Sequence, residues 1–363
     1  MKIANIDTLL VRLPSDGGAP PAECPGPRWT IFDVLLVKLT TDDGLVGWGE
    51  AFGHSIARAT KVTIDELIAP MVLGADAIDI AGIAHRCNRA LHMFGRNGSF
   101  TYALSGLDLA LWDIAGKAAG MPVHRLLGGA ARTEVDAYAS LLIYGLPHVT
   151  AAKAASAVAA GFRHVKLHEA AVAPVLATRE AVGPHIELML DPNCAWTCEE
   201  ALRLAPELKQ ADLRWIEDAI WPPEDHVSMR RLRDAGIRVA AGENTGTLFD
   251  FARLMERDAV DVVQPDVTKI GGITEWRKIA ALAEAHGVFL SPHSACYGPG
   301  FLATVHLLAA RPEPSVLERM HLELEATLYP GLTEAVDGRV RVPTEPGLGP
   351  EPDPDVIDRY RIA

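Results

Sequence analysis

The feature that most constrains the fold is a repeat of strand-like and helical segments over the C-terminal two thirds of the chain. Short apolar runs rich in Val, Ile and Leu alternate with stretches in which apolar residues recur at helical spacing. Such alternation predicts a parallel sheet, and eight units predict closure into a TIM-type (β/α) barrel. The eight runs are residues 135–140, 164–168, 187–191, 214–217, 238–243, 261–266, 288–293 and 315–318.

The N-terminal third has a different pattern. Residues 1–12 and 30–40 have strand-like composition, and Asp42-Asp43-Gly44 indicates a turn into a third strand, LVGWGE. From about residue 55 to residue 118 the spacing becomes helical, until Gly120-Met121-Pro122 ends the run. The chain therefore begins with a small α+β unit. The segment SDGGAPPAECPGPRW, between the first two strands, is expected to form a long flap.

The length of 363 residues fits one barrel of roughly 250 residues and one smaller domain. We assign residues 1–125 to the N-terminal α+β domain and residues 126–335 to the barrel. Residues 336–363 are rich in proline and partly strand-like, and we expect them to return to the N-terminal domain.

Composition excludes several classes of function. The net charge of −13 argues against a nucleic-acid partner, because binding phosphates requires a basic face. No apolar run reaches the roughly 18 residues of a membrane span, and the N-terminus lacks a secretory signal, so we expect a cytoplasmic protein. The five cysteines contain no CxxC pair and indicate neither a disulfide framework nor a zinc site: Cys24, Cys87, Cys194, Cys198 and Cys296.

Ionisable residues occupy one position of the repeat. Each lies at or just after the end of a strand-like run, and successive members are 23 to 27 residues apart. In a (β/α) barrel this position is the C-terminal rim, where active sites are built, so these side chains are expected to meet in one cavity. They are Lys166, Asp191, Glu217, Glu243, Asp266, His293 and Glu318.

Three of these residues suggest a metal site. Asp191, Glu217 and Glu243 end consecutive strands and supply the hard oxygen ligands that Mg²⁺ prefers. A single carboxylate of this kind is usually a solvated surface charge. Three in the same phase favour a Mg²⁺ site, because a divalent cation would relieve their mutual repulsion.

Two further pairs suggest acid–base chemistry. Lys166 and His168 are two residues apart on one strand, so both side chains point to the same face. Asp266 and His293 end adjacent strands, where the carboxylate can bind one imidazole nitrogen and fix its tautomer. Most histidines in a protein are merely hydrogen-bonded polar groups. The position of His293 and its acidic partner set it apart.

The strand ends VKLH, MLDPN, WIED, AGEN, QPDVTKIGG, SPHS and VLER resemble the signatures of the mandelate racemase subgroup of the enolase superfamily. The resemblance extends to GWGE and to the segment ALSGLDLALWDIAGK, and so covers nearly the whole chain. It implies an α/β fold in which an N-terminal α+β capping domain covers a (β/α) barrel. It also implies a homo-oligomer built from dimers, such as an octamer.

The resemblance assigns roles to individual residues. It implies that Asp191, Glu217 and Glu243 bind Mg²⁺. Lys166 and Glu318 would contact the substrate carboxylate or its reacting oxygen, and Asn193 would help to hold the substrate. His293, paired with Asp266, would be one acid or base, and His168 would lie opposite it. The intermediate left when the α-proton departs would be an enediolate, an anion stabilised by the positive charge around it.

The sequence departs from the family pattern at two places. His168 replaces the second lysine of the common KxK motif, which changes the charge and reach of that acid or base. Asp218-Ala219 replaces the usual acid and proline, and is expected to alter loop shape more than metal binding. Lys269 resembles the lysine base of muconate lactonising enzymes, but Asp266 with His293 favours the racemase-like arrangement and a structural role for Lys269.

These observations predict an enzyme that acts on a small carboxylate. The leading hypothesis is a Mg²⁺-dependent dehydratase, a carbon–oxygen hydro-lyase that converts an aldonate or aldarate into a 2-keto-3-deoxy acid. The alternatives are a racemase, epimerase or cycloisomerase, and a barrel that binds a ligand without catalysis. The capping domain is expected to select the substrate through Arg28, Trp29 and His54, although Arg28 and Trp29 can equally be a surface arginine and an anchoring tryptophan.

Overall fold

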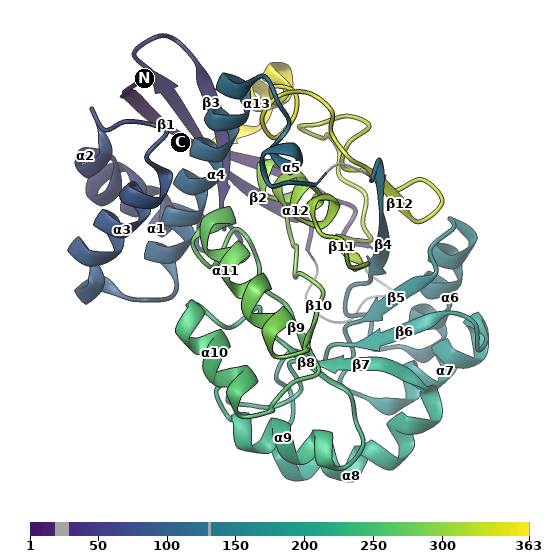
Figure 1. The fold of residues 1–363 in the computed structure, drawn as a ribbon. Helices are drawn as coiled ribbons and strands as arrows, with labels where there is room; N and C mark the ends of the chain where they lie inside the picture. Colours follow the sequence, from purple (N-terminus) through teal and green to yellow (C-terminus); the bar gives the residue numbers. More distant parts are fainter. Residues whose placement is uncertain (19–28, 130–131, 363) are drawn as a thin grey trace.

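The computed structural model describes residues 1–18, 29–129 and 132–362 of the chain. The N-terminal part contains a four-stranded antiparallel sheet, of which β1, β2 and β3 are labelled in Figure 1. Its strands stand in the order β13-β1-β2-β3, so the last strand of the chain completes the first sheet. The bounds are β1 Ile3–Pro14, β2 Ile31–Thr41, β3 Val46–Ala51 and β13 Arg361–Ile362.

Helices cover one face of this sheet. The longest, α4 (Ser99–Ala119), packs on β3, where the backbones approach so closely that a Cβ on Gly49 would lie 2.0 Å from the carbonyl oxygen of Gly106. Gly120 ends α4 in the left-handed region, at φ 65°. The other segments are α1 Ala57–Val62, the π-helical turn Thr63–Ile68, α2 Ala69–Val72, α3 Ile80–Ala90, the 3₁₀ turn His92–Phe94 and α5 Val123–Leu126.

The predicted eight-stranded parallel sheet is present. All eight strand-like runs of the sequence form strands, which pair in the order β10-β9-β8-β7-β6-β5-β4-β11. Ser315 Oγ donates to Leu290 O (2.6 Å) and Ser291 Oγ donates to Val316 O (3.1 Å), which links β10 to the start of β11. The strands are β4 Glu134–Ser140, β5 His164–Leu167, β6 Glu187–Leu190, β7 Leu213–Glu217, β8 Val239–Ala241, β9 Val262–Val263, β10 Phe289–Leu290 and β11 Leu317–Met320.

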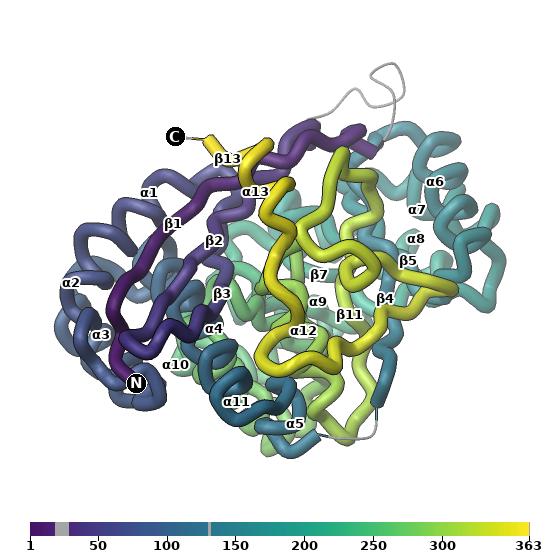
Figure 2. Tube along the Cα trace, turned by 90° about the horizontal axis from the view of Figure 1, so that it is seen from above, coloured from purple at the N-terminus to yellow at the C-terminus, as the bar shows by residue number. Residues whose placement is uncertain are grey.

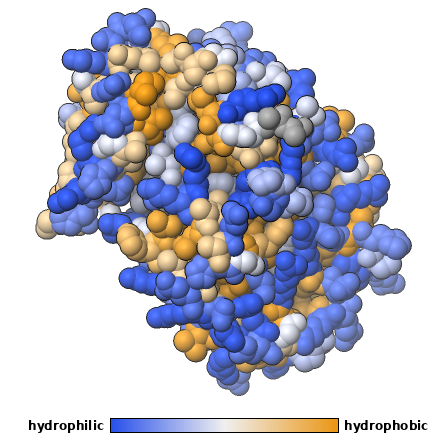
Figure 3. Space-filling view, in the orientation of Figure 1, coloured by the Kyte–Doolittle hydropathy of each residue, from blue (hydrophilic) through white to orange (hydrophobic). Residues whose placement is uncertain are grey.

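A helix lies in each connection between successive strands from β4 to β11 and packs outside the sheet (Figure 1). Local signals set the helix ends: Thr197 and Glu200 form a capping box at the start of α8. The outer faces at the lower edge, around α8 and α9, are mainly hydrophilic in Figure 3. The helices are α6 Pro147–Ala159, α7 Val172–Val182, α8 Cys198–Leu208 with the 3₁₀ turn Lys209–Ala211, α9 His226–Asp234, α10 Leu248–Glu256, α11 Gly272–Ala285 and α12 Pro299–Ala310.

The interior of the barrel changes from apolar to polar along the strands. A buried cluster fills the lower layer with Tyr138, Met189, Trp215, Ala240, Val262 and Val316. Strand side chains alternate, so residues two positions later point into the barrel again. For five of these six residues, the residue two positions later is polar and buried: Ser140, Asp191, Glu217, Gln264 and Glu318. These buried polar residues form a layer, called here the polar floor, that lies above the apolar layer of the barrel.

The C-terminal segment leaves the barrel and returns to the first sheet, as the yellow trace in Figure 2 shows. Strand β12 (Arg339–Arg341) pairs antiparallel with β4, α13 (Pro354–Tyr360) packs on β1, and β13 pairs antiparallel with β1. Between them, Glu351 accepts a hydrogen bond from Lys117 Nζ (2.6 Å). None of the helices in the described part of the chain has the length and apolar composition that crossing a membrane requires.

Candidate active site

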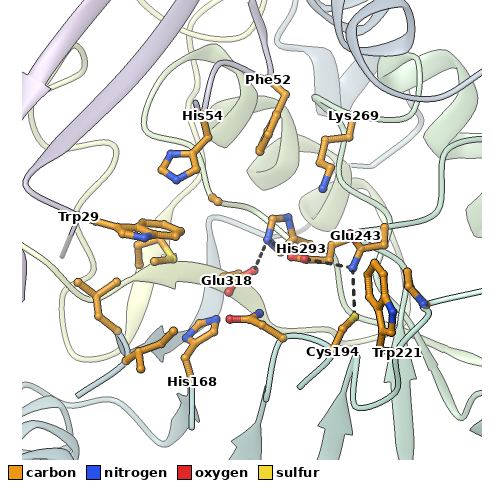
Figure 4. Close-up of a pocket in the computed structure, with 17 residues that line it drawn as sticks. Trp29, Phe52, His54, His168, Cys194, Trp221, Glu243, Lys269, His293 and Glu318 are labelled. Carbon is orange, nitrogen blue, oxygen red and sulfur yellow. Dashed lines mark hydrogen bonds and ion pairs between the residues drawn. The ribbon is translucent and has the colours of Figure 1, made fainter. Parts of the chain in front are cut away.

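A cavity of about 390 Å³ opens at the carboxyl ends of the barrel strands, beneath the capping domain (Figure 4). Both domains contribute to its wall, which is typical of ligand sites. From the capping domain come Trp29, Phe52 and His54. The barrel contributes Leu142, Ile143, His168, Asn193, Cys194, Trp221, Pro223, Glu243, Asn244, Lys269, His293, Ala295, Glu318 and Met320.

Lys166 lies at the centre of the polar floor. It is completely buried, and its Nζ is 2.6 Å from Glu217 Oε1, 2.8 Å from Glu318 Oε1 and 3.5 Å from Asp191 Oδ2. Burial lowers the pKa of Lys166, but Glu217 and Glu318 outweigh it and hold that pKa well above its ordinary value. The lysine therefore remains a cation that three strands share.

Glu318 is fixed as a carboxylate. Besides Lys166, its oxygens accept hydrogen bonds from Ser140 Oγ (2.7 Å) and from the backbone N–H of Ser294 (3.0 Å). Burial raises the pKa of Glu318, but the charges of Lys166 and His293 outweigh burial and lower it to about 2. Its side chain lines the cavity, so an ionised acceptor faces any ligand there.

His293 and Asp266 make the predicted contact. His293 Nδ1 is 2.6 Å from Asp266 Oδ2, while the other Asp266 oxygen accepts from the N–H (2.7 Å) and Oγ1 (2.6 Å) of Thr268. The imidazole Nε2 lies 2.8 Å from Glu243 Oε2 and 3.9 Å from Glu318 Oε2. Burial lowers the pKa of His293, but Glu243 and Glu318 outweigh it and raise that pKa well above its ordinary value.

His168 lies on another side of the cavity from His293 (Figure 4). Its Nδ1 is hydrogen-bonded to the carbonyl oxygen of Leu141, which can only accept, so Nδ1 carries the proton. The remaining nitrogen, Nε2, is 3.4 Å from Asp191 Oδ2. Burial lowers the pKa of His168, and the contact with Asp191 more than reverses this and raises it.

The donor set for a divalent cation stands at the ends of three neighbouring strands, β6, β7 and β8. The buried Oδ2 of Asp191 lies within ion-pair distance of Lys166 Nζ (3.5 Å) and His168 Nε2 (3.4 Å) but receives no well-formed hydrogen bond from the described residues. Burial, together with Asp191 and Glu318, raises the pKa of Glu217 to about 7 even though Lys166 opposes it. The site thus contains more carboxylates than basic groups that can neutralise them. The residues fit Mg²⁺ by ligand chemistry and by this uncompensated charge.

The three carboxylates are not gathered around one point. Glu217 is turned to Lys166 and Glu243 to His293. Within residues 1–18, 29–129 and 132–362, no three His, Cys, Asp or Glu side chains stand together as a metal-binding group. Binding a cation would therefore require these glutamates to exchange a contact with a basic side chain for a contact with the metal.

The capping domain forms an aromatic wall. The rings of Trp29 and His54 lie 4.3 Å apart, and those of Phe52 and His54 lie 6.4 Å apart. Burial lowers the pKa of His54. Trp29 and His54, which we expected to contact the substrate, both line the cavity. Arg28, the third such residue, lies outside the described residues.

Sequence reasoning missed several side chains at this site. Ser140 and Gln264 hold Glu318 and Glu217, with Gln264 Nε2 donating to Glu217 Oε2 at 2.6 Å. The sequence did indicate that both side chains point into the barrel, since each follows an inward-facing apolar residue by two positions. Asn193 lines the cavity as expected, and its backbone N–H donates to Asp191 Oδ1 (2.8 Å). Lys269, interpreted above as structural, also lines the cavity.

Comparison with known proteins agrees with this architecture. Residues 30–128 match the mandelate racemase / muconate lactonizing enzyme N-terminal domain, and residues 149–356 match the enolase C-terminal domain-like family. Together the two matches cover the cap and the barrel that enclose the cavity.

Similar proteins include enzymes that act on sugar acids. A 3,6-anhydro-alpha-L-galactonate cycloisomerase of Streptomyces coelicolor is 34% identical in sequence, over an alignment that covers 88% of this chain and 88% of that protein. An arabinonate dehydratase of Saccharolobus solfataricus is 31% identical, with 91% of each chain covered. The crystal structure of a racemase from Streptomyces coelicolor with bound magnesium has a TM-score of 0.86 at 32% identity, covering 99% of this chain and 100% of that one. This chain therefore belongs to the mandelate racemase / muconate lactonizing enzyme family of the enolase superfamily.

Proposed function

We propose that the protein is a Mg²⁺-dependent dehydratase of a sugar acid, an aldonate or aldarate. The observation that carries the proposal is a pair of imidazoles, each with Nδ1 fixed by an acceptor, on two sides of a cavity floored by Lys166 and Glu318. The arabinonate dehydratase among the relatives supports the same reaction class.

The cation would be held by Asp191, Glu217 and Glu243. When bound, Mg²⁺ would lower the energy of negative charge on the substrate carboxylate. Lys166 is a permanent cation within the floor and would bind the same carboxylate as its charge grows. Glu318, held as an anion, would accept a hydrogen bond from a substrate hydroxyl. Together these groups orient the α-carbon between the two histidines.

His168 and His293 would perform the proton transfers. Nδ1 of each is engaged by an acceptor, so Nε2 is the nitrogen that would face the substrate once Glu243, now 2.8 Å from His293 Nε2, and Asp191, now 3.4 Å from His168 Nε2, turn to the cation. One imidazole takes the α-proton, and the electron pair of the C–H bond enters the bond between the α-carbon and the carboxyl carbon. The other donates a proton to the β-hydroxyl, which leaves as water as the α,β double bond forms. The resulting enol tautomerises to the 2-keto-3-deoxy acid.

The test is an incubation of the protein in Mg²⁺ and D₂O with a library of aldonic and aldaric acids. Formation of a 2-keto-3-deoxy acid is expected from at least one of them, and absence of ketoacid from every member would refute the dehydratase. His168→Asn and His293→Asn then assign the roles. Loss of the base abolishes deuterium exchange at the α-carbon, whereas loss of the acid leaves exchange and stops the loss of water.

A cycloisomerase, racemase or epimerase is the second candidate. It is favoured by the anhydrogalactonate cycloisomerase and the racemase among the similar proteins, and by the two imidazoles, which can deliver a proton to either face of a planar intermediate. Its signature is deuterium uptake with an isomeric product and no ketoacid. Mass spectrometry separates the two reactions, because only dehydration removes 18 mass units.

A further inference from the structure

Lys269 is a positively charged residue of the cavity that takes no part in the proposed reaction. It lies between β9 and α11 and is only 8% exposed, and its side chain lines the cavity. Its Nζ stands 4.9 Å from the centre of the Phe52 ring, beneath the aromatic wall of the capping domain. In Figure 4 it points into the cavity from the side opposite His168.

The ammonium group has no anionic partner in contact. Among the described residues, no carboxylate lies within ion-pair distance of Lys269, in contrast to Lys166, which contacts Glu217 and Glu318. Burial lowers the pKa of Lys269, but Glu243 and other groups at longer range outweigh burial and raise it, so the lysine stays charged. The charge of Lys269 is therefore balanced only at longer range, and no carboxylate of the described residues contacts its ammonium.

Among the described residues, the carboxylates near Lys269 form no ion pair with it, and most of their oxygens are bound to other groups. Glu243 is bound to His293, and Asp266 is bound to His293 and to Thr268. Asp218 Oδ2 accepts a hydrogen bond from Asn244 Nδ2 (2.9 Å), whereas its buried Oδ1 has no hydrogen-bond partner among the described residues and forms no ion pair with Lys269. An anion that pairs with Lys269 therefore has to arrive with the ligand, through the cavity.

We propose that Lys269 binds a second carboxylate of the substrate, at the end remote from the carbon that loses its proton, and that the enzyme consequently prefers diacids to monoacids. The inference rests on the proposed function and narrows its substrate class to aldarates. Phe52 covers the ammonium on one side and keeps water away, which strengthens a charge-assisted hydrogen bond to carboxylate. The hydroxymethyl end of an aldonate would leave the cation unpaired.

The experiment compares acids that differ only at the terminal carbon: galactarate with galactonate, and glucarate with gluconate. Binding to the full-length protein is measured by calorimetry in Mg²⁺, and α-carbon deuterium exchange is measured in parallel. The variants are Lys269→Met, Lys269→Arg, and the matched control Lys278→Met, which removes a lysine that is paired with Glu275 on the outer surface of α11.

The wild-type protein and the control should bind the diacid of at least one pair about 10- to 100-fold more tightly than its monoacid, the usual range for a hydrogen bond to a charged group. Lys269→Met should lose this preference while still binding the monoacid, which shows that it folds, and Lys269→Arg should keep most of it.

Equal binding of diacid and monoacid by the wild-type protein, or a preference that survives in Lys269→Met, overturns the inference. Failure of the proposed function looks different. In that case a Lys269-dependent diacid preference persists in binding, but no ketoacid is formed from any acid.

Discussion

Lys166 shows how strongly single residues at this site depend on one another. Its ammonium lies between Glu217, Glu318 and Asp191, all buried. Replacing it in Lys166→Met leaves carboxylates in the barrel without their counter-ion, and breaking a buried pair in this way typically costs about 3–5 kcal/mol. Chemical denaturation should therefore show a lower free energy of unfolding for Lys166→Met. Lys278→Met, at an exposed pair, should change it by less than about 0.5 kcal/mol.

Asp266 acts through His293. In Asp266→Asn the volume is kept, but the anion that holds Nδ1–H and stabilises the protonated ring is lost. Because proton transfer by a positioned side chain contributes about 10²- to 10⁴-fold, we expect the turnover number for the best sugar acid to fall within that range. The thermal midpoint should fall as well, because a buried ion pair is broken, so turnover is compared at a temperature at which both proteins are folded. A turnover number unchanged by Asp266→Asn would show that His293 needs no acidic partner.

Among elements, the contact of β3 with α4 is the tightest in the capping domain. A Cβ on Gly49 would lie 2.0 Å from Gly106 O, and one on Gly47 would lie 2.3 Å from Ala110 O, so neither position has room for a side chain. Gly49→Ala must push the helix off the strand. Overpacking of this kind costs about 1–3 kcal/mol, and differential scanning calorimetry should show a lower unfolding temperature. Thr40→Ala, a half-buried position on the neighbouring strand β2, serves as the control.

The packing of α12 against α5 contains a buried histidine pair. His306 Nε2 donates to Leu348 O (3.0 Å), so its Nδ1 is the acceptor for His124 Nδ1–H, also at 3.0 Å. Burial lowers the pKa of His306 to about 3, against the opposing effect of the bond to Leu348. The folded protein thus keeps this ring neutral at pH values where the unfolded chain protonates it.

Protonation of His306 in the unfolded chain should make the protein less stable at low pH. Above the unfolded pKa of roughly 6.5 the full stability is present, and it declines as the pH falls toward the folded value. His306 alone should remove about 2 kcal/mol between pH 8 and pH 5. Denaturation curves of His306→Asn should show a correspondingly weaker loss over this interval. His185→Asn, at an exposed histidine, should leave the slope as it is in the wild type.

For the molecule as a whole, sequence periodicity was enough to predict the barrel. The eight runs became eight parallel strands because each is short and apolar and a helix connects it to the next. The ionisable residues met at one rim because they share a phase of the repeat. His293 reached Asp266 for the same reason, since the ends of adjacent strands are neighbours.

Features that depend on distant packing could not be predicted. Lys269 lies beyond its strand, so alternation does not fix the direction of its side chain. Its ammonium lies in the cavity beside Phe52, a residue of the other domain. Likewise, the sequence indicated Glu217 and Glu243 as carboxylates at the rim, but not that they would turn to Lys166 and His293. Such choices are set by the balance of charges across the whole site.

The balance of charges in the site should change when Mg²⁺ binds. In the proposed metal site, Glu217 and Glu243 would leave their basic partners to bind Mg²⁺. The protein should then gain stability from Mg²⁺ as any ligand-binding native state does, by about 2.7 kcal/mol at one hundred times the dissociation constant. Thermal unfolding followed by circular dichroism should show a higher midpoint in Mg²⁺, reversed by a chelator, and the gain should disappear in Asp191→Asn and Glu243→Gln. Glu66→Gln, at an exposed carboxylate, should retain it. A midpoint insensitive to Mg²⁺ in the wild type would mean that the carboxylates of β6, β7 and β8 serve only as counter-ions for Lys166 and the histidines.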